Sequence, residues 1–212
     1  DAGCIVPSLY RPFTKQWLYF NRHFNEMVLQ MPRIFPDARS KNVVIQVSGV
    51  GARAGFSACI ANAIPSLDTI EKGQCFPLYL YDEAAQQCND GLFSGESSDA
   101  PRRRDAITDV ALAHFQSAYP GEKINKEDLF YYVYGILHSP DYRERYADNL
   151  SKELPRIPRV RKATDFWDFS KAGRALAELH LNYESVEKYS LDIETKGKLT
   201  DGDYRVEKMK FA

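Results

Sequence analysis

The 212-residue sequence lacks several features that usually identify a class of protein. Its 28 basic and 29 acidic residues nearly cancel, so no excess of one charge points to a partner. This balance does not exclude nucleic acid, because the distribution of charge over the surface matters more than its sum. No apolar run approaches the roughly 20 residues that a membrane span needs. The start, DAGCIVPSLYRPF, has no signal-peptide pattern, so we expect a cytoplasmic protein with no membrane partner.

Cysteine pairs and catalytic signatures are also absent. The chain contains no CxxC pair, no GxSxG elbow, no HExxH helix, and no helicase or amino-methyltransferase motif. We therefore expect no catalytic residue, no metal and no cofactor in this chain, and we favour a binding or coupling role. No histidine lies at zinc-ligand spacing from a cysteine, so we interpret the isolated cysteines as reduced intracellular thiols: Cys4, Cys59, Cys75 and Cys88.

A glycine-rich stretch at residues 48–55 is the one feature that suggests a nucleotide-binding loop. Glycines after a strand let backbone N–H groups approach a phosphate. A P-loop would continue with Lys-Ser/Thr, whereas here Gly55 is followed by Phe56-Ser57. We therefore expect a tight or mobile loop with Arg53 at its tip as a candidate contact to nucleic acid. A stand-alone nucleotide-using enzyme is the weakest hypothesis.

The hydrophobic pattern predicts an α+β fold. We expect a small mixed or antiparallel β unit in the N-terminal half, packed against a helical bundle from about residue 105 to 183, with short C-terminal strands. The runs richest in strand formers are 16–20, 42–47, 56–65 and 76–81. Residues 24–32 are expected to make a helical turn that ends at or before Pro32.

Composition divides the chain into four parts that we expect to form one composite domain of a larger protein. Residues 1–81 are β-rich, and residues 82–104 are a polar linker or loop, poor in apolar residues. Residues 105–187 form a helical scaffold. Residues 188–212 contain two strand-like runs that we expect to return to the core.

The first expected helix has Asp105 as its N-cap and an apolar stripe with a period of 3.6 residues. We interpret His114 as a packed core histidine rather than a ligand, because it lies on that stripe. The stripe residues are Ile107, Val110, Ala111, His114, Phe115 and Ala118.

The helices that follow are bounded by local signals. Asn125 is expected to cap one helix, and Ser139 to cap the next with Pro140 in its first turn. Residues 154–158, LPRIP, should run extended, because residues before proline avoid the helical region. The last helix is expected to begin at Thr164 or Asp165, with a stripe of Phe169, Ala172, Gly173, Leu176, Leu179, His180 and Tyr183.

Basic residues alternate with aromatic ones over residues 1–41. This pattern has two readings: a solvated face, or a surface that follows phosphates with aromatic rings between the charges. The first is the more common case for exposed charge. The candidate contacts are Arg11, Lys15, Arg22, Arg33, Arg39 and Arg53, with Arg102, Arg103 and Arg104 as a mobile clamp and Arg143 and Arg145 as a second choice.

Residues 128–158, DLFYYVYGILHSPDYRERYADNLSKELPRIP, closely resemble the C-terminal target-recognition region of large bacterial adenine-specific DNA methyltransferases. The resemblance is strongest to the single-polypeptide (type ISP) restriction–modification enzymes, which join nuclease, helicase-like ATPase, methyltransferase and recognition domains. Four further segments resemble the same enzymes: YRPFTKQWLYFNRHFNE (10–26), GQCFPLYLYD (73–82), KAGRALAELHLNYESVE (171–187) and YRVEKMKF (204–211).

The resemblance implies that this chain recognises a double-stranded DNA sequence, with residues 1–81 reading the DNA. It also implies an upstream methyltransferase domain in the same polypeptide, which would use S-adenosylmethionine, ATP and magnesium outside this chain. It carries no fixed base-reading residues, because each member of the family reads a different site. The alternative is an interaction or coupling module that docks on the methyltransferase or helicase domain through an apolar patch on the helices of 127–150.

Overall fold

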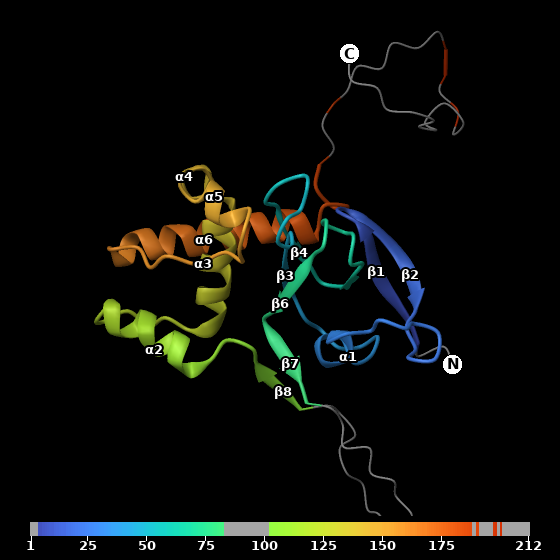
Figure 1. Ribbon diagram of the computed structural model, residues 1–212, viewed down its shortest axis with the longest axis horizontal. Helices are drawn as coiled ribbons and strands as arrows, with labels where there is room; N and C mark the ends of the chain where they lie inside the picture. The colour runs from blue at the N-terminus through green and yellow to red at the C-terminus, as the bar shows by residue number, and fades with distance from the viewer. Residues whose placement is uncertain (1–3, 83–101, 188–189, 191–196, 199, 201–212) are drawn as a thin grey trace, which may run out of the picture.

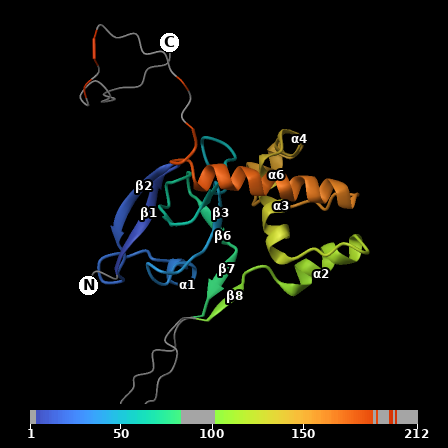
Figure 2. The same ribbon diagram turned by 180° about the vertical axis from the view of Figure 1, so that it is seen from behind.

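The computed structural model describes residues 4–82, 102–187, 190, 197, 198 and 200 (Figure 1). Small sheets and the short helix α1 (Met31–Ile34) lie on one side of the molecule, and helices α2 to α5, between residues 109 and 150, lie on the other, as both views show (Figure 2). The predicted α+β fold, a small β unit packed on a helical bundle, is confirmed. Cys88, most of residues 82–104 and the strand-like runs expected after residue 188 lie outside the described residues.

Within the described residues, the strands come first along the chain, interrupted by one short helix, and the remaining helices follow them. The strands are β1 (Ile5–Arg11), β2 (Thr14–Tyr19), β3 (Val44–Val47), β4 (Ala58–Ala61), β5 (Ile64–Pro65), β6 (Gln74–Pro77), β7 (Tyr79–Tyr81) and β8 (Arg103–Asp105). The helices are α1 (Met31–Ile34), α2 (Asp109–Ala118), α3 (Lys126–His138), α4 (Pro140–Arg145), α5 (Ala147–Leu150) and α6 (Ala163–Leu181).

The N-terminal sheet has the order β2-β1-β5, with β1 antiparallel to β2 and parallel to β5. The sequence pattern predicted β2 but not β1, whose run contains Pro7. Proline is tolerated there because β5 pairs with β1 only at Ser8 and Leu9, so the missing N–H of Pro7 is not needed on that side. The hairpin therefore joins the rest of the fold through the second half of β1.

The second sheet, β4-β3-β6, is antiparallel and holds the two hydrophobic cores together. All four residues of β3 are buried, because the sheet is covered on both faces. Ile45 and Val47 face the larger core, which they share with helices α2 to α6, whereas Val44 faces a smaller core under the N-terminal sheet. The alternation along one strand thus links the β unit to the helices.

The helical half is organised around the crossing of α3 and α6. Gly135 and Gly173 meet there so closely that a Cβ added to Gly173 would lie 2.0 Å from the backbone oxygen of Tyr131. Tyr132 stacks on Phe166 beside the crossing, with 4.7 Å between ring centroids. The two glycines allow the backbones to approach, and the stacked rings fill the adjacent core.

The predicted starts of α3 and α4 are confirmed. Asn125 and Asp128 form a reciprocal capping box at the start of α3. Ser139 caps α4, with Pro140 in its first turn. The following residues 154–158 run without helix or strand, as expected from their prolines.

The predicted start of α2 is wrong. Asp105 lies in β8, paired with Tyr79 of β7, and the helix is capped by Thr108, whose side chain accepts from the N–H of Ala111. The expected stripe is consequently displaced: Val110 is 81% exposed, and His114 is exposed instead of packed in the core.

Two other helix predictions need correction. Helix α1 begins at Met31 and carries Pro32 in its first turn, so this proline helps to start a helix rather than end one. The buried face of α6 consists of Phe166, Ser170, Gly173 and Ala177, whereas Leu179 of the expected stripe is 51% exposed. His180 is packed as predicted: its Nδ1 lies 2.6 Å from the hydroxyl of Tyr134.

Candidate nucleic-acid interface

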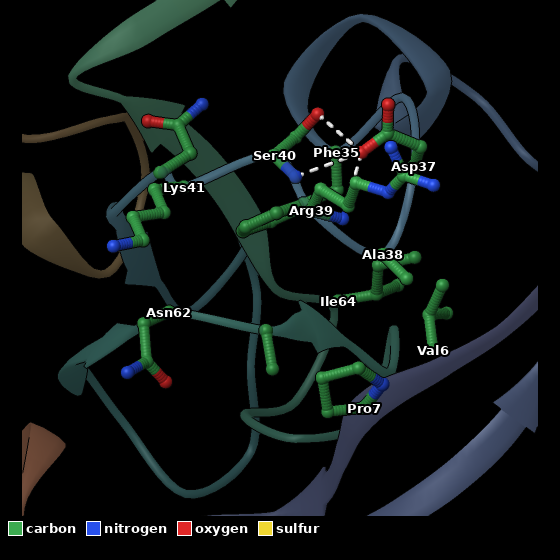
Figure 3. Close-up of a pocket in the computed structure, with 12 residues that line it drawn as sticks. Val6, Pro7, Phe35, Asp37, Ala38, Arg39, Ser40, Lys41, Asn62 and Ile64 are labelled. Carbon is green, nitrogen blue, oxygen red and sulfur yellow. Dashed lines mark hydrogen bonds between the residues drawn. The ribbon is translucent and has the colours of Figure 1, made fainter. Parts of the chain in front are cut away.

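A cavity of about 630 Å³ opens between β1, the loop after α1 and the turn between β4 and β5 (Figure 3). Arg39 and Lys41 come from the loop, and Asn62 comes from the turn. All three side chains are exposed, and Val6 and Ile64 supply apolar wall behind them. The cavity therefore combines two cations, one amide and the exposed Asp37 carboxylate at its rim with an apolar floor.

The rim loop has a defined shape. One carboxylate oxygen of Asp37 accepts from the backbone N–H groups of Arg39 and Ser40, at 2.7 and 2.8 Å, and from the Ser40 hydroxyl at 2.9 Å (Figure 3). This Asx-type turn satisfies the local backbone without using the Arg39 guanidinium. The guanidinium is thus available to a ligand.

The end of the same loop is anchored in the protein interior. The buried Asn42 side chain donates to the carbonyls of Ile34 and Tyr79, at 2.9 and 2.8 Å, and accepts from the Tyr79 N–H. The Tyr81 hydroxyl donates to the carbonyl of Lys41 at 2.9 Å. Lys41 therefore extends from a backbone that is fixed on both sides.

The backbone N–H groups of the glycine-rich loop, residues 48–55, already bind a carboxylate of the protein. Glu71 accepts from the backbone N–H groups of Arg53 and Ala54, at 2.8 and 3.2 Å, and from Arg53 Nε at 3.1 Å. The Arg53 hydrogen bond is the main reason that the pKa of Glu71 lies below its ordinary value. A phosphate would have to displace this carboxylate, so the geometry argues against a nucleotide loop. Arg53 itself is exposed at the tip.

Arg11 and Lys15 lie at the turn end of the hairpin and both contact the protein. Arg11 donates to the carbonyl of Asp68 and lies over the Tyr10 ring. Lys15 Nζ is 2.7 Å from a carboxylate oxygen of Glu184, beyond the end of α6. DNA phosphate would therefore compete with an intramolecular partner at Lys15.

Two further candidates, Arg22 and Arg33, lie near α1. Arg22 is exposed in the segment after β2. Arg33 is half-buried in α1, where its guanidinium donates to the Gln30 side chain at 3.2 Å. The structure brings these two residues to the same N-terminal half as Arg39, but it does not place them on the cavity.

The arginines at 102–104 are held by a strand rather than in a mobile segment. Arg103 and Arg104 belong to β8, which pairs with β7. Arg103 lies over the Tyr79 ring at 4.1 Å, and Arg104 pairs with Asp82 at 3.2 Å. Arg102 is exposed.

Arg143 and Arg145 lie on α4, on the opposite side of the molecule from the hairpin (Figures 1 and 2). Arg143 Nε donates to the carbonyl of Leu137 at 2.6 Å, which satisfies a free acceptor at the end of α3. Burial lowers the pKa of Arg143. Arg143 is thus part of the helix junction, whereas Arg145 is exposed.

The comparisons with known proteins decide the family. A profile described as "Type ISP C-terminal specificity domain" matches residues 1–212. The chain belongs to this family. A search of curated proteins finds no match.

Solved structures similar to this specificity domain are much longer chains. The chain is 42% identical, with a TM-score of 0.77, to part of the cryo-EM structure of a DrdV–DNA complex. It is 36% identical, with a TM-score of 0.67, to a nuclease-deletion mutant of the Type ISP restriction-modification enzyme LlaGI in complex with a DNA substrate mimic. It is 29% identical, with a TM-score of 0.73, to the ATP-dependent Type ISP restriction-modification enzyme LlaBIII bound to DNA. Each comparison covers 90% of this chain but only 17%, 15% and 12% of the other.

The described part of the specificity domain shows neither a metal site nor a membrane span. No group of three or more His, Cys, Asp or Glu residues there could hold a metal ion. None of its described helices is long and apolar enough to cross a membrane. The described cysteines, Cys4, Cys59 and Cys75, are free thiols.

Two sets of surface residues of the specificity domain were not predicted from the sequence: the neighbours of Arg39 at the cavity, and a basic run before α6. Lys41 and Asn62 join Arg39 at the cavity, but they lie 21 residues apart in a chain whose folding is needed to bring them together. The run RIPRVRK at 156–162 has four basic residues and no acidic one. The density of positive charge in this run is visible in the sequence, although its proline indicates only an extended backbone.

Proposed function

We propose that this chain recognises a double-stranded DNA sequence for a larger restriction–modification polypeptide. The observation that carries the proposal is the family match over residues 1–212, together with similarity to enzymes whose structures contain DNA. The chain spans less than a fifth of those enzymes, so the chemistry belongs to other parts of the polypeptide. This division explains a specificity domain with no catalytic motif.

The intact polypeptide is expected to methylate adenine and to cleave DNA with the help of a helicase-like motor. It would use S-adenosylmethionine, ATP and magnesium in its other domains and would act in the bacterial cytoplasm. The domain before this chain is expected to be the methyltransferase, which needs a recognition partner to select its adenine.

The cavity at Arg39, Lys41 and Asn62 is the best candidate for base readout. Arginine pairs with guanine through two hydrogen bonds in the major groove, and asparagine pairs with adenine in the same way. The fixed backbone around Lys41 and the Asx-type turn at Asp37 would hold these side chains in place before DNA arrives. The exposed Arg22, Arg53, Arg102 and Arg145 are candidates for phosphate contacts, which position a protein without reading sequence.

Selection from a random duplex library tests this function. The purified chain is incubated with the library at low salt, and bound DNA is recovered, amplified and sequenced over several rounds. Enrichment of one short motif is expected, and the motif should compete for binding better than a scrambled duplex in fluorescence anisotropy. Binding without enrichment, or no binding at low salt, would refute sequence recognition by this chain.

The docking alternative receives no support from the helices on which it was expected. None of the large hydrophobic side chains exposed in the described residues comes from 127–150. Exposed apolar side chains lie instead on the hairpin and the segment after it, including Trp17 at 76% and Phe24 at 77%. An apolar face of this kind is typical of an interface. In the proposed polypeptide it would pack against the domain that precedes this chain.

A further inference from the structure

The extended segment Arg156–Lys162 presents a row of cations on the helical half of the molecule. It lies between α5 and α6, on the side of the molecule opposite the hairpin (Figure 1). Arg156, Arg159, Arg161 and Lys162 are exposed, whereas Ile157 and Val160 are half-buried against the larger core. The segment thus separates its residues into apolar anchors and exposed charges.

Three tyrosine hydroxyls hold the backbone of this segment at alternate residues. Tyr142 of α4 donates to the carbonyl of Arg156 at 3.0 Å, Tyr132 of α3 to that of Pro158 at 2.6 Å, and Tyr119 to that of Val160 at 2.6 Å. Tyr132 also accepts from the Val160 N–H at 3.3 Å. Burial raises the pKa of Tyr132 to about 12, so its hydroxyl keeps the proton that it donates.

This attachment fixes the backbone before any partner binds. A flexible basic tail loses backbone entropy at each residue that it orders on a ligand. Here that cost has been met by folding, since alternate carbonyls are already bound to the helices. Only the side chains of the row remain to be ordered.

The charges of the row are largely unneutralised. Arg156 pairs with Glu153 at 2.8 Å, and the Arg159 guanidinium donates to the His114 carbonyl at 3.4 Å. Within the described part of the chain, Arg159, Arg161 and Lys162 form no ion pair. The nearest acidic residues along the chain, Glu153 and Asp165, lie outside the row.

We propose that Arg159, Arg161 and Lys162 form a preformed contact to the DNA phosphate backbone, separate from the base-reading cavity. The proposal rests on the DNA recognition inferred above and adds a second surface to it. Exposed cations on a rigid, extended backbone suit a partner that carries one negative charge at each repeat along its length. Duplex DNA is such a partner.

An acidic protein surface fits this row less well. Protein interfaces have an apolar core with aromatic residues, surrounded by a polar rim. Ile157 and Val160 are half-buried against the larger core, and the four cations of the segment are its exposed side chains. The row therefore offers mainly charge to a partner.

The salt dependence of DNA binding tests the proposal. The variant Arg159→Gln/Arg161→Gln/Lys162→Gln is compared with the unmodified chain by anisotropy on a fluorescein-labelled duplex of scrambled sequence, at about 50 to 200 mM salt. The slope of log K against log salt is negative, and each phosphate contact contributes about 0.9 to its magnitude. We therefore expect the magnitude of the slope to fall by about 2 to 3 in the variant. Affinity at the low-salt end should fall by about tenfold or more.

The matched control is Lys152→Gln/Lys171→Gln/Lys198→Gln, which removes the same charge from exposed positions outside the row. It should change the slope by much less. Equal effects of the two triple variants would overturn the row as a contact while leaving DNA recognition intact, and so would no effect of either. If the unmodified chain does not bind DNA at all, the proposed function itself fails. Circular dichroism of each variant verifies that it is folded.

Discussion

At the residue scale, the loop that carries Arg53 depends on a single carboxylate. Glu71 binds two backbone N–H groups and the Arg53 guanidinium. Glu71→Gln keeps an acceptor oxygen but loses the charge that strengthens these bonds. We expect the amides of Arg53 and Ala54 to lose protection against hydrogen exchange severalfold, measured by NMR. Glu26→Gln, which removes an exposed carboxylate elsewhere, should leave both amides unchanged.

The same loop should loosen in acid. Arg53 keeps the pKa of Glu71 below its ordinary value of 4.5 in the folded chain. The stabilisation is therefore complete above that value and is lost as the pH falls through the lower folded pKa. If the exchange of Arg53 and Ala54 in Glu71→Gln matched that of the unmodified chain at neutral pH, the carboxylate would not be the anchor.

His138 is a half-buried base at the junction of α3, α4 and α6. Arg143 Nη2 lies 3.4 Å from its Nδ1, and arginine can only donate, so Nδ1 accepts and the neutral ring carries its proton on Nε2. Nε2 is buried without a hydrogen-bond partner in the described part of the chain. Burial first, and then the charges of Arg143 and His180, lower the pKa of His138 to about 4.

This shift predicts a loss of stability in mild acid. Between the ordinary value of 6.5 and about 4 the unfolded chain binds a proton that the folded chain does not, so the free energy of unfolding falls as the pH falls through that window. Allowing for the partial exposure of the ring, we expect a loss of about 2 kcal/mol. Urea unfolding at several pH values measures it. His138→Asn should flatten this part of the profile, and the exposed His114→Asn should not; an unflattened profile in His138→Asn would contradict the assignment.

At the element scale, the structures that the sequence predicted well are those with local causes. The caps at Asn125 and Ser139 need only neighbours within three residues, so their pattern is legible without the fold. The predicted start of α2 was wrong because β7 pairs with residues 103–105, which lie 22 to 26 positions further along the chain, and takes Asp105 into a strand. The residues near Asp105 in the sequence give no indication of that pairing.

The face of α6 was misplaced for a related reason. Its buried positions include Gly173, which packs by backbone rather than by side chain. Hydrophobic periodicity gives weight to Leu179 and little to glycine or to Ser170, although these two small residues lie at the crossing with α3. A stripe made of small residues is therefore easily missed.

Gly173→Ala tests the closeness of this crossing. The added Cβ would meet the backbone oxygen of Tyr131 at 2.0 Å and the backbone nitrogen of Gly135 at 2.7 Å, so the helices must separate. We expect a destabilisation of about 1–3 kcal/mol, the usual range for overpacking, even though alanine is the better helix former. Urea unfolding measures it. Gly197→Ala makes the same chemical change where an added Cβ would meet no atom of the described residues within 4 Å beyond its chain neighbours, and it should have little effect; equal stability of both variants would argue against a tight crossing.

At the scale of the whole molecule, family and fold class were readable from the sequence, but the surface that would bind DNA was not. Lys15 was a candidate by its neighbours in the sequence, and its partner Glu184 lies 169 residues away. Arg39 was predicted as a contact, yet the cavity beside it also needs β1 and the turn that carries Asn62. Charge can be counted along a chain, whereas its neutralisation and its grouping depend on tertiary contacts.

The two surfaces proposed for DNA should separate affinity from specificity. Arg39→Gln removes a candidate base contact, which is worth about 1–3 kcal/mol of discrimination. It should weaken binding to the duplex selected by this chain by about 5- to 150-fold and leave a scrambled duplex almost unaffected. The triple variant of Arg159, Arg161 and Lys162 should weaken binding to both duplexes by the same factor, because phosphates carry no sequence information. Anisotropy titrations of both variants on both duplexes measure the four affinities. If Arg39→Gln weakened both duplexes equally, Arg39 would be a phosphate contact, and base readout would have to lie elsewhere in the domain.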